Sequence, residues 1–63
     1  MDIKSEALAL EARAAAAGVD MAVILAEASV HRATWDRWKA GNNSPRLVAW
    51  RDVIKAIEKR EAA

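Results

Sequence analysis

The sequence contains no cysteine, tyrosine or phenylalanine, and its 63 residues include one proline, two glycines and three tryptophans. Without thiols the chain has no disulfide framework, no thiolate metal site and no cysteine nucleophile. No apolar run reaches the ~18 residues that a membrane span needs. Acidic residues come early in the N-terminal segment, which lacks the basic-then-apolar order of a signal peptide. We therefore expect a cytoplasmic protein with no membrane partner.

Catalytic signatures are also missing. The sequence has no phosphate-binding glycine loop, and its one histidine has no cysteine with which to build a zinc site. No pair of carboxylates occurs at an obvious pocket. We predict that the protein is not an enzyme, with no catalytic residue, no metal ligand, no cofactor and no small-molecule substrate.

Helical periodicity runs along the whole chain, without a strand pattern, a repeat or a linker. The chain is predicted to form a single domain, 1–63, close to the smallest size that one core can stabilise. We expect helices over residues 3–17, 21–28, 32–40 and from 44–45 to about 60. Their ends are marked by capping and stop residues: Asp2, Asp20, Gly18, Gly41 and the Ser44-Pro45 pair. The predicted fold is all-α, a compact four- to five-helix bundle.

The apolar stripe of each predicted helix indicates which residues form the core. The first stripe is mostly alanine, which favours the helix but offers little side-chain volume. We expect the last three residues, 61–63, to fray. The predicted buried positions are Ile3, Ala7, Leu8, Leu10, Ala14 and Ala17; Val23, Ile24, Leu25 and Ala28; and Leu47, Trp50, Val53, Ile54 and Ile57.

Residues 31–40 form a helix with two opposite faces when they are placed at about 100° per residue. Trp35 and Trp38 lie on one face, together with His31 and Thr34. Tryptophans can stack on bases in single-strand binders, but their position opposite the basic edge favours a role in the core. The other face is polar, and two short alanine side chains keep part of it close to the backbone. It consists of Arg32, Ala33, Asp36, Arg37 and Ala40. This combination is typical of a helix that enters the DNA major groove.

Charge is distributed unevenly along the chain. Residues 1–30 carry two basic and five acidic side chains, a net charge of −3, whereas residues 31–63 carry eight basic and four acidic side chains, a net charge of +4. The basic half begins where the polar helix begins. A single lysine or arginine most simply solvates a helix surface, but a cluster of this kind is typical of phosphate contact.

Between residues 18 and 45 the chain resembles the Cro/repressor-type helix-turn-helix family, in particular its small phage Cro-like members. Before the second helix the family has a glycine and an apolar residue, here Gly18-Val19, and in the turn a small residue and valine, here Ser29-Val30. The recognition helix of the family carries a Thr-apolar-x-Arg-Trp run, here Thr34–Trp38. A glycine and a Ser-Pro pair follow it, here Gly41 and Ser44-Pro45. Three residues depart from it. Ser29 replaces a turn glycine, Leu25 a small alanine, and Met21 a glutamine that touches phosphate.

Four residues are predicted to read bases: Arg32, Ala33, Asp36 and Arg37. A guanidinium can donate two bonds to guanine O6 and N7, and a methyl group can touch thymine. Arg32 and Asp36 are also spaced for an intrahelical ion pair. Asp36 either accepts from cytosine or orients Arg32, and the second role is favoured because phosphates repel an acid.

Five residues are predicted to contact phosphates: His31, Lys39, Asn42, Asn43 and Arg46. Phosphate contacts set the register of a protein on DNA without reading sequence. His31 alternatively serves as a poor N-cap or packs on the aromatic side, and the two asparagines also suit a loop.

The expected function is sequence-specific binding of double-stranded DNA by a transcriptional regulator. The resemblance implies a Cro-like phage or prophage repressor in the host cytoplasm or nucleoid. One reading helix contacts few base pairs, so we expect a homodimer on an operator with half-sites ~34 Å apart, joined through the last helix at Val48 and Trp50. The alternatives are an antitoxin-type protein and a purely protein-interaction helical module.

Overall fold

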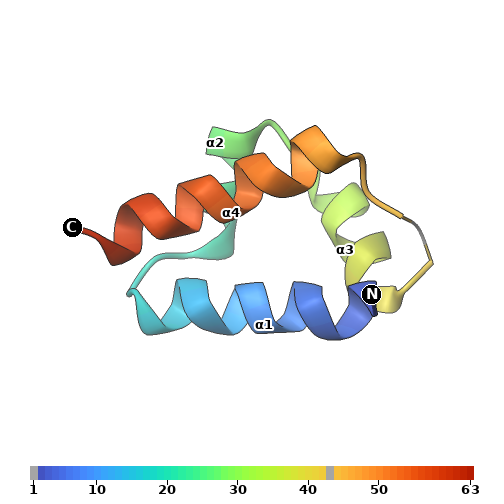
Figure 1. The fold of residues 1–63 in the computed structure, drawn as a ribbon, viewed down its shortest axis with the longest axis horizontal. Coiled ribbons are helices and arrows are strands. Elements are labelled where there is room, and N and C mark those ends of the chain that lie inside the picture. The colour runs from blue at the N-terminus through green and yellow to red at the C-terminus, as the bar shows by residue number, and fades with distance from the viewer. Residues whose placement is uncertain (1, 43) are drawn as a thin grey trace.

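Four helices make up the part of the chain that the computed structural model describes, residues 2–42 and 44–63. They are α1 (Ile3–Ala16), α2 (Met21–Ala28), α3 (Arg32–Ala40) and α4 (Leu47–Glu61). No strand occurs among these residues, so the all-α prediction is confirmed for them. The long helices α1 and α4 run along the molecule, with α2 behind α4 and α3 at one end (Figure 1). No helix in this part is long and apolar enough to cross a membrane.

Local signals place most of the helix ends. The Asp2 carboxylate accepts hydrogen bonds from the Ser5 N–H and hydroxyl, and the Asp20 carboxylate accepts one from the Ala22 N–H at 2.9 Å. Gly41 follows α3 with a φ of 77°. Ser29 also has a positive φ, 57°, in the turn after α2. A non-glycine residue in this conformation costs about 1 kcal/mol.

Both ends of α4 differ from the prediction. The helix starts at Leu47, with an extended Arg46 (ψ 141°) as its N-cap, and not at the Ser44-Pro45 pair. The predicted start was wrong, because residues 44–46 lie outside the helix and the extended residue before its first turn is Arg46. At the other end Glu61 is helical and does not fray, because it accepts two hydrogen bonds from the Arg13 guanidinium, at 3.0 and 2.7 Å.

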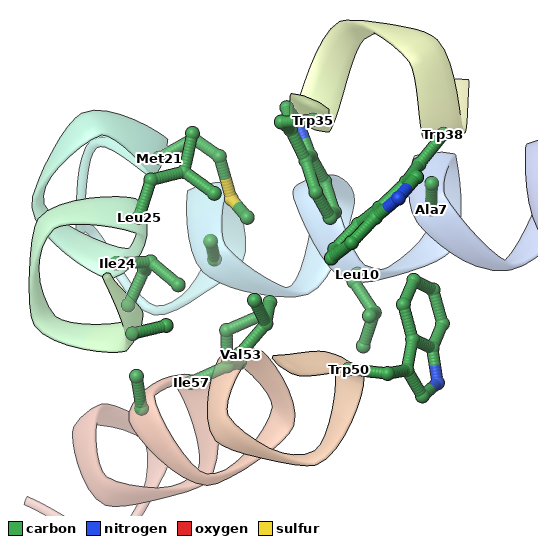
Figure 2. Close-up of a cluster of buried hydrophobic side chains, with 13 residues drawn as sticks. Ala7, Leu10, Met21, Ile24, Leu25, Trp35, Trp38, Trp50, Val53 and Ile57 are labelled. Carbon is green, nitrogen blue, oxygen red and sulfur yellow. The ribbon is translucent and has the colours of Figure 1, made fainter. Parts of the chain in front are cut away.

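The core lies where one face of each helix meets the others (Figure 2). Most predicted core positions are buried, but Leu8, Val23 and Leu47 are 46%, 45% and 68% exposed. Leu8 and Val23 lie one residue, about 100°, away from buried Ala7 and Ile24, and Leu47 is the first residue of its helix. Two further core residues were not predicted: Met21 and Ala56.

Candidate nucleic-acid interface

Helix α3 is anchored by a cluster of three tryptophans. Trp35 is fully buried, and Trp38 and Trp50 are 3% and 8% exposed. The ring centroids lie 5.7 Å apart for Trp35–Trp38, 5.6 Å for Trp38–Trp50 and 6.5 Å for Trp35–Trp50, with edge-on, edge-on and stacked geometries. Figure 2 shows the rings from α3 and α4 meeting over α1. The tryptophans are therefore core residues, and Trp50 is not exposed for the dimer contact that was predicted for it.

A carboxylate on α1 adds a polar anchor to the same helix. Glu11 accepts a hydrogen bond from the Trp35 indole N–H at 3.0 Å, and the Lys39 ammonium lies 3.2 Å from a Glu11 oxygen. Both partners favour the charged carboxylate, so the Trp35 bond first, and Lys39 after it, hold the pKa of Glu11 below its usual value. Because Trp35 and Lys39 both belong to α3, this contact fixes the rotation of α3 on α1.

The face of α3 opposite the tryptophans is open to solvent. All five residues that the sequence placed there are exposed: Arg32, Ala33, Asp36, Arg37 and Ala40. The Arg32 Nε lies 3.6 Å from an Asp36 carboxylate oxygen, with both side chains 56% exposed. This is the intrahelical pair that the spacing allows, and such exposed pairs contribute only a few tenths of a kcal/mol. It leaves both groups able to exchange partners.

Arg37 stands in a different environment from Arg32. It forms no ion pair with any residue in 2–42 or 44–63. Its guanidinium projects from the middle of the exposed face, with the small side chains of Ala33 and Ala40 one turn to either side. The two short alanine side chains leave space on both sides of the Arg37 side chain.

The five predicted phosphate contacts fall into three groups. His31, Asn42 and Arg46 are exposed at the ends of α3 and at the start of α4, and His31 is the N-cap of α3 without a side-chain cap bond. Lys39 is held by Glu11 and is 24% exposed, so its charge is already compensated inside the protein. Asn43 lies outside the described residues.

Several basic side chains of residues 31–63 form ion pairs with acidic residues of the N-terminal half. Besides Lys39, both Lys59 and Arg60 pair with Glu27 of α2, at 3.7 and 3.1 Å. These contacts join the two oppositely charged halves of the sequence. Within the described ranges the cations of the basic half that have no acidic partner are Arg37, Arg46, Arg51 and Lys55.

Glu11, which positions α3 in the candidate site, was not predicted from the sequence. Its two partners on α3 lie 24 and 28 positions further along the chain, so no local spacing reveals the contact. The only signal was its place beside the buried stripe, next to Leu10. Met21 and Leu25, two of the departures from the family pattern, are both buried and belong to the core.

Comparison with protein-family models, with curated proteins and with solved structures gives no match.

Proposed function

We propose that the protein is a sequence-specific double-stranded DNA-binding transcriptional regulator in which α2, the turn at residues 29–31 and α3 form a helix-turn-helix. The observation that carries the proposal is the two-sided α3. Trp35 and Trp38 fix one side in the core, while the other side presents arginines, an acid and alanines to solvent. An α-helix of this shape fits the major groove, about 12 Å wide.

The exposed residues of α3 have distinct roles in this proposal. Arg37, which has no acidic partner among residues 2–42 and 44–63, donates two hydrogen bonds to a guanine. Arg32 makes a second base contact, with Asp36 beside its guanidinium, and Ala33 lies against a thymine methyl group. His31, Asn42 and Arg46 bind phosphates and set the register of α3.

Two copies acting together provide the required specificity. A single α3 contacts only a few base pairs, and each correct bidentate contact contributes about 1–3 kcal/mol of discrimination. A two-fold dimer on a pseudo-palindromic operator doubles the number of contacts. Occupation of such an operator blocks polymerase, so we propose a repressor; the resemblance to Cro-type proteins supports this mode of action.

The test is binding to mixed-sequence duplex DNA over a range of salt concentrations. Wild type is compared with Arg32→Ala/Arg37→Ala and with the charge-matched control Lys4→Ala/Lys59→Ala, which removes two cations from other helices. We expect wild-type affinity to fall steeply with salt. On the sites that wild type selects from the mixture, the α3 variant should bind at least ~10-fold more weakly than the control. Absence of wild-type binding at low salt, or equal losses in both variants, would refute the proposal.

A further inference from the structure

One face of α4 points away from the core and combines an apolar side chain with charges of both signs. Val48 is 70% exposed, the highest value among the large apolar residues of the described chain. Arg51, Asp52 and Lys55 follow it at spacings of three, four and seven residues, which place all four side chains on one face. Together they line a shallow depression of about 200 Å³. We call this set, Val48, Arg51, Asp52 and Lys55, the α4 outer face.

The charges of the α4 outer face have no partner in residues 2–42 and 44–63. Asp52 and Lys55 are spaced for an intrahelical ion pair, yet none of the three charged residues takes part in an ion pair or side-chain hydrogen bond there. The next turn of the same helix differs, because Lys59 and Arg60 both pair with Glu27. The outer face is thus a local arrangement of uncompensated charges.

The order of these side chains is self-complementary. We propose that the α4 outer face docks onto the same face of a second copy of this chain, with the two α4 helices antiparallel across a two-fold axis between positions 51 and 52. A two-fold interface requires one patch that fits itself. With the axis at this point, Arg51 faces the partner's Asp52, and Val48 faces the methylene stem of the partner's Lys55. Each contact occurs twice, and both signs of charge are satisfied.

The small size of this face determines the strength of the dimer. Stable interfaces use about 20–30 residues on each side, whereas this one is centred on four side chains. Exposed pairs of opposite charge and one apolar contact per side give a dimer that forms only at high protein concentration and weakens in salt. The role of this dimer in the cell rests on the proposed function. Two neighbouring DNA half-sites hold two copies at an effective concentration of about 1 mM, which is high enough for a weak dimer to form.

Sedimentation equilibrium without DNA, at protein concentrations up to about 1 mM, tests the docking face. Arg51→Asp sets two acids against each other and should weaken dimerisation at least ~10-fold. The exchange Arg51→Asp/Asp52→Arg keeps composition and net charge and re-creates the pair in the opposite sense, so it should restore dimerisation to within ~3-fold of wild type. Lys4→Asp, the same charge change on an exposed residue of α1, should leave dimerisation unchanged.

Three outcomes would overturn the proposal: a monomeric wild type at the highest concentration, a dimer that Arg51→Asp does not weaken, or an exchanged variant as weak as Arg51→Asp. Circular dichroism verifies that each variant is folded, and Asp52→Arg alone provides a second single reversal. The measurement contains no DNA, so a failure of DNA binding leaves it unaffected. Conversely, binding of a monomer to a single half-site tests the proposed function without self-association.

Discussion

Replacement of Glu11 tests whether the carboxylate on α1 holds α3 in place. Glu11→Ala removes the acceptor of the Trp35 indole N–H and the counter-ion of Lys39 together. A buried donor that loses its partner costs ~1–3 kcal/mol, and partial access of water to this site places the expected loss at about 1–2 kcal/mol. For a domain of this size the midpoint of thermal unfolding should fall by roughly 5–15 °C.

Glu11→Gln separates the two contributions. The amide oxygen still accepts from Trp35, whereas the charge opposite Lys39 is lost, so we expect a loss of only about 0.5 kcal/mol. Thermal and urea unfolding followed by circular dichroism measure both variants, with Glu58→Ala, an exposed acid on α4, as a control within about 0.5 kcal/mol of wild type. Equal stabilities of Glu11→Ala and Glu11→Gln, or no change in either, would refute the role of Glu11.

Three further predictions concern stability. Ser29→Gly should stabilise the protein by about 0.5–1 kcal/mol in urea unfolding, because glycine adopts the φ of 57° without strain; an unchanged or lower stability contradicts this. Trp35→Ala should cost about 3–5 kcal/mol, much of the stability of a small domain, and a native-like melting curve would disprove the anchoring role of the cluster. Acidification should destabilise the fold. The pKa values of Glu11 and Glu61 are lowered in the folded state from 4.5, so their contribution is complete above about pH 5 and is lost as pH falls through the folded values. Stability that stays constant from pH 5 to about pH 3 would contradict it.

Short-range signals explain why the sequence predicted α2 and α3 so closely. The Asp20 cap, the positive φ of Gly41 and the 3.6-residue period of the tryptophans act within one or two turns. The same period placed the exposed face of α3 correctly. Ser29, which stands where the resembled family usually has a turn glycine, has the positive φ that glycine adopts readily.

Tertiary contacts explain what the sequence did not predict. The Ser44-Pro45 pair is a good local start for a helix, but α4 begins only at Leu47, after an extended Arg46. Glu61 is ordered by Arg13, 48 residues earlier in the chain. The ion pair of Lys39 with Glu11, 28 positions earlier in the chain, was likewise not predicted. For Glu61 and Lys39 the partner is distant in sequence, so local pattern alone does not reveal the contact.

The most direct test of the account is an NMR titration of ¹⁵N-labelled protein with a mixed-sequence duplex at low salt. The account predicts that the largest amide shift changes occur on the exposed side of α3, at Arg32, Ala33, Asp36 and Arg37, with smaller changes at His31, Asn42 and Arg46. Arg37→Ala should reduce the changes and the affinity together. An unchanged spectrum, or changes confined to α1 and the C-terminal half of α4, would contradict the claim that α3 is the DNA-reading helix.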